Sequence, residues 1–79
     1  MRFLFFAQIK DALGASEMEM HIRGLSGAEE VWRALIAARP KLAAFRSSTR
    51  LARNGEYTGS DTVFSDADEV ALIPPVSGG

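Results

Sequence analysis

Apolar residues fill two short runs near opposite ends of the chain, residues 3–6 and residues 70–73. Both runs are apolar at every position, which is typical of strands that are covered on both faces. We therefore expect strands at residues 2–6 and 69–73, lying side by side and parallel at the centre of one sheet. The prolines after residue 73 end the second strand, because proline cannot donate a ladder hydrogen bond.

Strict alternation of polar and apolar residues covers residues 17–23. The apolar positions Met18, Met20 and Ile22 fall on one face, and the polar positions fall on the other. This alternation predicts a half-buried strand, antiparallel to the first strand. The preceding residues 9–13 favour one helical turn, closed by a left-handed glycine at residue 14.

A helix is expected after Ser26, because Ser26 and Glu29 have the spacing of a capping box. Pro40 disfavours helical geometry at the residue before it, so the helix should end near residue 38 or 39. Leu42 and Phe45 are expected to pack beneath the loop that returns the chain to the sheet. The apolar residues of the helix recur at helical spacing along one stripe: Ala28, Val31, Trp32, Leu35 and Ile36.

A hairpin is expected at residues 50–57, because Asn54 and Gly55 favour the left-handed conformations of a two-residue turn. The polar segment that follows should wrap over the surface, anchored by Val63 and Phe64. In this order the elements suit an α+β fold, a mixed sheet packed on one main helix. This is the ubiquitin-like β-grasp arrangement. We expect one domain at residues 1–75 and a flexible, extended tail at residues 76–79.

Charge and composition exclude several classes of partner. Nine basic and ten acidic residues are interspersed and leave a net charge of −1, so we expect no nucleic-acid partner. Arg46, Arg50 and Arg53 could form a small basic patch or a solvated face. The longest apolar run, residues 3–7, is too short to span a bilayer, and a secretion signal is lacking. Together with the absence of cysteine, these features favour a cytoplasmic protein without a membrane partner.

The body of the domain shows no pattern typical of an active site. His21 lies on the polar face of an alternating strand and has no cysteine or serine placed to act as its nucleophile. Asp66, Asp68 and Glu69 lack the ligand spacing and the glycine of a calcium loop, so an acidic turn explains them better than a metal site. We expect no bound cofactor, no metal and no catalytic side chain in this chain.

Two features point to chemistry with a partner. The first is the end of the chain, where Gly78 and Gly79 lack Cβ atoms and can pass through a narrow channel with a terminal carboxylate. A frayed end is the alternative, but the stiff spacer Pro74-Pro75 favours insertion. The second feature is an apolar outer face of the sheet, which one helix cannot cover. It comprises Leu4, Phe6, Ala71 and Ile73 and is typical of a protein interface, unless the loop after the helix folds across it.

Three segments of the chain resemble the small subunit of molybdopterin synthase. They are Leu-Phe-Phe-Ala-Gln at residues 4–8, Asp-Glu-Val-Ala at residues 68–71 and Pro-Pro-Val-Ser-Gly-Gly at residues 74–79. The similarity spans the whole chain in length and in the order of elements. Residues 66–68 depart from it, because Asp-Ala-Asp stands where this family often has Asp-Gly-Asp. The departure affects only the turn before the last strand.

The resemblance implies a sulfur carrier that is not an enzyme on its own. In that family an adenylating enzyme related to the ubiquitin-activating enzymes uses ATP to convert the terminal carboxylate, here that of Gly79, into an acyl-adenylate. A sulfur donor then converts the adenylate into a thiocarboxylate. The tail, consisting of Pro75, Val76, Ser77 and Gly78, would carry this group into the large synthase subunit, which holds the catalytic side chains.

The large subunit would be bound in a heterotetramer, and sulfur would pass to cyclic pyranopterin monophosphate to form molybdopterin. The residues expected at the contact are Leu4, Phe6, Tyr57, Ala71 and Ile73. Three alternatives share the fold: a sulfur carrier for thiamine or for tRNA thiolation, a ubiquitin-like protein modifier, and an interaction module with an inert tail.

Overall fold

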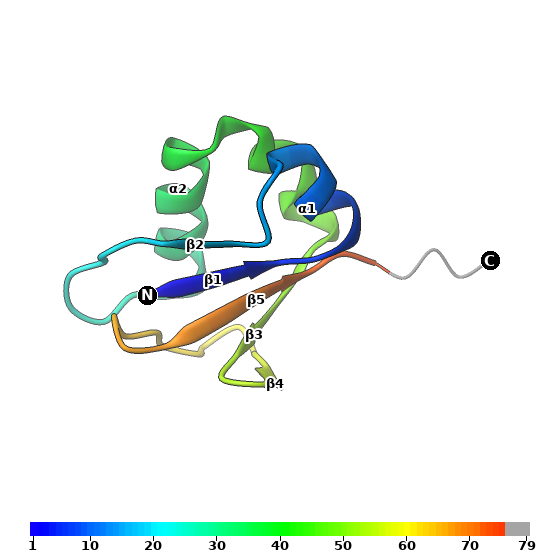
Figure 1. The fold of residues 1–79 in the computed structure, drawn as a ribbon. Coiled ribbons are helices and arrows are strands. Elements are labelled where there is room, and N and C mark those ends of the chain that lie inside the picture. The colour runs from blue at the N-terminus through cyan, green and yellow to red at the C-terminus, as the bar shows by residue number, and fades with distance from the viewer. Residues whose placement is uncertain (76–79) are drawn as a thin grey trace.

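The computed structural model describes residues 1–75, and residues 76–79 lie outside the described part of the chain. Five strands, two α-helices and one 3-10 helix follow one another along the described chain (Figure 1). In order they are β1 (Arg2–Phe5), α1 (Ala7–Leu13), β2 (Glu17–Glu19), α2 (Ala28–Ala38), the 3-10 helix η1 (Pro40–Ser48), β3 (Arg50–Arg53), β4 (Glu56–Tyr57) and β5 (Glu69–Ile73).

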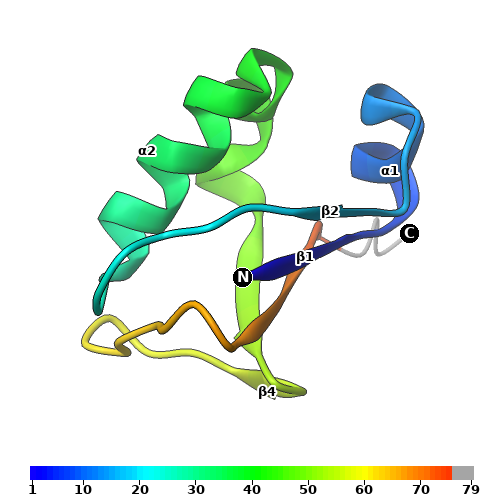
Figure 2. The same ribbon diagram turned by 60° about the vertical axis from the view of Figure 1, so that its left-hand side comes forward.

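The strands form one mixed sheet in the order β2-β1-β5-β3-β4. The central pair, β1 and β5, is parallel, as the two apolar runs predicted, and the other neighbours are antiparallel. Figures 1 and 2 show α1, α2 and η1 together on one side of the sheet. This arrangement is the expected α+β, ubiquitin-like β-grasp fold, and no helix of residues 1–75 lies on the other side of the sheet.

The core lies between α2 and the inner face of the sheet. Phe3, Phe5, Val70 and Leu72 supply that face, and the helix contributes the buried residues of its predicted stripe. Leu42 is buried and Phe45 packs against the core, but they belong to η1 and not to an irregular loop. The largest fully buried side chains of the core are those of Phe3, Phe5, Ile9, Val31, Leu35, Leu42, Phe64, Val70 and Leu72.

Three predicted element boundaries are wrong: the end of the first strand, the start of α1 at Ala7 instead of residue 9, and the end of the alternating strand. The first strand stops at Phe5, because Phe6 is the residue that caps α1 and the helix already begins at Ala7. The alternating strand ends at Glu19 instead of residue 23. Met20 still exchanges hydrogen bonds with Met1, at 2.9 and 2.6 Å. Beyond it the backbone N–H of Ile22 donates to the carboxylate of Asp66 at 2.9 Å instead of to a strand. The pattern of alternation therefore extends beyond the strand that it predicted.

The capping box at Ser26 and Glu29 is also wrong. The residue at the N-terminal cap of α2 is Gly27, and it makes no side-chain hydrogen bond to the helix. Ser26 instead pairs with Phe64 in an isolated β-bridge, with backbone hydrogen bonds of 2.9 and 2.7 Å. Glu29 and Glu30 still lie in the first turn, where negative charge complements the helix dipole.

Two predicted turns are confirmed. Gly14 closes α1 with φ of 68°, in the left-handed region. Asn54 and Gly55 have φ of 50° and 90° at the turn between β3 and β4. Asn54 also ties the hairpin to β5, because its side-chain oxygen accepts a hydrogen bond from the backbone N–H of Glu69 at 2.9 Å.

Candidate functional site

The outer face of the sheet carries one continuous row of apolar and aromatic residues. In the strand register Leu4 lies beside Ala71, Ala71 beside Ala52, and Ala52 beside Tyr57. The row therefore crosses four strands, from β1 to β4. Ile73 lies two residues beyond Ala71 on β5, and we call these five residues together the outer row.

Exposure separates four members of the outer row from the core on the same strands, whereas the fifth member, Ala52, is only 5% exposed. Leu72 is 0% exposed, whereas its neighbour Ile73 is half-buried and Tyr57 is 57% exposed. Phe6, at the end of β1, is 46% exposed. The loop after the helix does not fold across the outer row, because η1 packs with the helices on the inner side (Figure 1). Apart from Ala52, the outer row is thus an apolar surface that no element of residues 1–75 covers.

The chain leaves the sheet beside this row. Ile73, the last residue of β5, pairs with Arg50 of β3. Pro74 is still buried, and Pro75 is exposed. The tail predicted to insert into a partner continues through Val76, Ser77, Gly78 and Gly79, which lie outside the described residues. Their expected roles therefore stay predictions.

A hollow of about 390 Å³ opens between the end of β1 and the start of α1. Phe6 and Ala7 both line this hollow. The backbone turns sharply at Ala7, whose φ is 49°. A recess beside an apolar row can receive a side chain from another protein. The residues that line the hollow are Arg2, Leu4, Phe5, Phe6, Ala7, Lys10, Ser16 and Glu17.

Charged residues lie at the two ends of the outer row. At one end Arg2 forms ion pairs with Glu17 at 2.7 Å and with Glu69 at 3.5 Å. At the end near the tail the guanidinium of Arg50 lies over the Tyr57 ring, 4.0 Å from its centroid. Sequence reasoning missed Arg50 and Ala52 as members of this face. The register of the Asn54-Gly55 hairpin, which pairs Ala52 with Tyr57, could have identified them.

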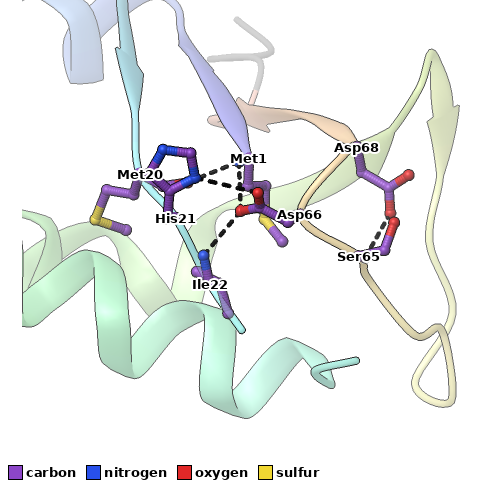
Figure 3. A network of polar contacts seen from close by, with 7 residues as sticks. All are labelled: Met1, Met20, His21, Ile22, Ser65, Asp66 and Asp68. Carbon is purple, nitrogen blue, oxygen red and sulfur yellow. Dashed lines mark hydrogen bonds and ion pairs between the residues drawn. The ribbon is translucent and has the colours of Figure 1, made fainter. Parts of the chain in front are cut away.

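The carboxylates of Asp66 and Asp68, near the start of β5, accept hydrogen bonds from backbone groups of neighbouring segments (Figure 3). Asp66 accepts hydrogen bonds from the backbone N–H of Ile22 at 2.9 Å and from the Met1 ammonium at 3.0 Å. It also contacts His21 Nδ1 at 3.2 Å. These contacts, that of Ile22 first, hold the pKa of Asp66 well below its usual range.

Asp68 has a similar structural role in the next turn. Its carboxylate accepts a hydrogen bond from the backbone N–H of Ser65 at 2.8 Å, which is the main reason that the pKa of Asp68 is lowered. The expected acidic turn is therefore found. Because β1 and β5 are parallel, this polar network lies at the opposite end of the central strands from the tail.

The fold and the outer row define a protein of the ubiquitin-like β-grasp class with a C-terminal extension beyond β5. The crystal structure of SAMP1 from Haloferax volcanii superposes with a TM-score of 0.85 at 28% identity, covering 100% of this chain and 98% of that one. A complex of subunits 1 and 2 of molybdopterin-converting factor from Helicobacter pylori shares the fold, with a TM-score of 0.69 at 24% identity, over 99% of this chain and 96% of that chain.

Sequence comparison identifies the family. The model of the ThiS family matches residues 3–79, and the chain belongs to this family. A molybdopterin synthase sulfur carrier subunit of Arabidopsis thaliana is 32% identical over 79 residues, covering 100% of this chain and 82% of the relative. A protein of the same name from Chlamydomonas reinhardtii is 32% identical over 81 residues, 98% of its length. The resemblance to molybdopterin synthase small subunits is confirmed. None of the helices within residues 1–75 is long and apolar enough to cross a membrane.

Proposed function

We propose that this chain is the sulfur carrier subunit of a molybdopterin synthase. The observation that carries the proposal is the match over the whole chain to relatives that bear this name. The fold supports it, because the last strand ends at Ile73, within an apolar surface that can bind a partner.

The chemistry of the carrier begins at Gly79. A carboxylate is a poor electrophile, so an adenylating partner first joins it to the α-phosphate of ATP and releases pyrophosphate. Hydrosulfide supplied by a sulfur donor then attacks the carbonyl carbon, the bond from that carbon to the phosphate oxygen breaks, AMP leaves with its electrons, and the thioacid loses its proton. The product is a thiocarboxylate at Gly79. ATP is thus consumed by the activating partner, and this chain needs no cofactor of its own.

Delivery of the sulfur requires the large synthase subunit. The tail from Pro75 to Gly78 enters that subunit, whose side chains perform the transfer to cyclic pyranopterin monophosphate. The contact uses Leu4, Phe6, Tyr57, Ala71 and Ile73, and it assembles a heterotetramer. The absence of cysteine fits a reducing compartment, and we assign the cycle to the cytoplasm. This chain is a carrier and co-substrate and is not catalytic on its own.

A second candidate function is protein modification. It is favoured by the likeness to SAMP1, since another crystal structure of that Haloferax volcanii protein is described as small archaeal modifier protein 1. A modifier would join Gly79 to a lysine of another protein through an isopeptide bond. Carriers for thiamine or tRNA thiolation would share the thiocarboxylate and differ in the acceptor of the sulfur.

Reconstitution separates these candidates. The chain is incubated with ATP, its adenylating enzyme, a sulfur source and the large synthase subunit, and cyclic pyranopterin monophosphate is supplied as substrate. The proposal predicts molybdopterin formation in proportion to the amount of carrier added. Loading of the tail with sulfur but no transfer to the pterin in the presence of the large subunit would reject the molybdopterin function in favour of another sulfur carrier.

A further inference from the structure

Arg50 and Tyr57 form a prearranged pair at the tail end of the outer row. Arg50 belongs to β3 and Tyr57 to the neighbouring strand β4, and both side chains are exposed. The guanidinium lies 4.0 Å from the centroid of the Tyr57 ring. A cation over an aromatic face is held there electrostatically, so Arg50 has less rotational freedom to lose when it binds something else.

The surroundings of Arg50 differ from those of the other arginines on the sheet. Arg2 is paired with two glutamates, and Arg53 donates to the carbonyl oxygen of Val63. Within residues 1–75, Arg50 has no carboxylate within ion-pair distance, because the ion pairs of that part of the chain involve other cations. The five donors of its guanidinium remain available while the ring occupies one face.

The position of Arg50 connects it to the tail. It is the register partner of Ile73, the last residue before the two prolines. Any protein that accepts the tail and covers the outer row must therefore bring its own surface over Arg50. An arginine covered in this way without a counter-charge would be strongly unfavourable, so the covering surface has to supply an acceptor.

We propose that Arg50 is a specificity-determining residue that binds a carboxylate at the rim of the channel that receives the tail. The proposal rests on the proposed function, which supplies the large synthase subunit as the partner. A nucleotide phosphate is a poorer fit for Arg50. In the proposed cycle the adenylate is formed and spent on the activating enzyme, before the chain meets the large synthase subunit, so no nucleotide phosphate is presented to Arg50 in that complex. The acceptor is therefore a protein carboxylate, which can approach the guanidinium from the sides that the Tyr57 ring leaves open.

The test measures the affinity of the full chain for the large synthase subunit of the same organism at low and at high ionic strength. Arg50→Met keeps the length of the side chain and removes the charge. Arg33→Met is the matched control, because Arg33 is an exposed arginine of α2, on the opposite side of the sheet from Arg50. Arg50→Lys keeps the charge without the planar fork, and thermal unfolding of each free variant verifies that it is folded.

We expect Arg50→Met to weaken binding on the order of tenfold at low ionic strength and to reduce the salt dependence of the affinity. Arg50→Lys should recover part of the loss, and Arg33→Met should bind like the unmodified chain. Equal affinity and equal salt dependence for Arg50→Met would overturn the proposal. So would a loss of affinity with unchanged salt dependence, because the contact would then be apolar. If the unmodified chain fails to bind the large subunit at all, the proposed function itself is refuted, and the role of Arg50 is refuted with it.

Discussion

The inner and outer faces of β1 and β5 carry similar apolar residues in two different environments. Phe3, Phe5 and Leu72 point toward α2 and are almost completely buried, whereas Leu4 and Ile73, on the same strands, face away and are half-buried. The inner residues stabilise the fold by removing apolar surface from water. The outer residues add less to that stability and leave a surface suited to a partner. Two adjacent residues of one strand can therefore serve folding and binding separately.

The largest effect is expected at the inner face. Leu72→Ala removes fully buried atoms and leaves a cavity, which should lower the free energy of unfolding by about 2 to 5 kcal/mol. A domain of this size gains no more than roughly 3 to 5 kcal/mol from its core, so the variant should be largely unfolded. Ile73→Ala is the matched control and should cost only about 1 kcal/mol. Chemical denaturation followed by circular dichroism measures both, and equal losses would contradict the separation of the two faces.

The next effect concerns binding at the outer face. Phe6→Asp or Ile73→Asp places a charge where we expect the large subunit to pack, and loss of such an apolar anchor should cost about 2 kcal/mol or more of binding free energy. Isothermal titration with the large subunit measures the loss, and circular dichroism verifies that the free domain is folded. If either substitution unfolds the free domain, that residue is part of the core and its assignment to the outer face is wrong.

A smaller, pH-dependent effect is expected at the far end of the sheet. Because the folded-state pKa of Asp66 is lowered from its ordinary value of 3.8, its contribution to stability is fully present above about pH 5 and is lost as the pH falls through the folded-state pKa. Asp66→Asn should therefore lower the melting temperature at neutral pH, and the difference from the unmodified chain should shrink in acid. Asp61→Asn, at an exposed position, is the control. A difference that stays constant with pH would show that the charge of Asp66 is not the cause.

The smallest effect is expected for His21→Ala. The side chain is 85% exposed and its contact with Asp66 is a surface ion pair at most. We predict no measurable change in sulfur loading or in molybdopterin formation. A clear loss of either activity in a folded variant would show that His21 has a chemical role and would contradict this prediction.

Much of the fold could be predicted because its signals are local. The doubly apolar runs predicted the central parallel strands, the helical stripe predicted α2, and Gly14 and Asn54-Gly55 predicted their turns. The errors arose where distant segments compete for the same backbone groups. Ser26 pairs with Phe64, and Ile22 donates to Asp66, although 38 and 44 residues separate these partners. No local pattern at Ser26 or Ile22 contains that information.

The candidate site was predictable to a similar extent. Alternation along β1 and β5 identified Leu4, Ala71 and Ile73 as outward residues, because a strand directs successive side chains to opposite faces. Ala52 and the stacking of Arg50 on Tyr57 depend on the pairing of three strands and were missed. The roles of Gly78 and Gly79 came from the resemblance to a family and from the absence of Cβ atoms, and they remain predictions that chemistry has to test.

The most direct test of the central claim is the mass of the intact chain after incubation with ATP, its adenylating enzyme and a sulfur source. We predict a gain in mass equal to the difference between one sulfur and one oxygen atom, located at Gly79. The variant that lacks Gly79 should gain nothing, because its carboxylate is set back by about 3.3 to 3.6 Å, and a misplacement of 1 Å can already cost on the order of a hundredfold in rate. Sulfur loading of the shortened chain would contradict the carrier function, and an isopeptide-linked tail without any thiocarboxylate would assign the protein to the modifiers.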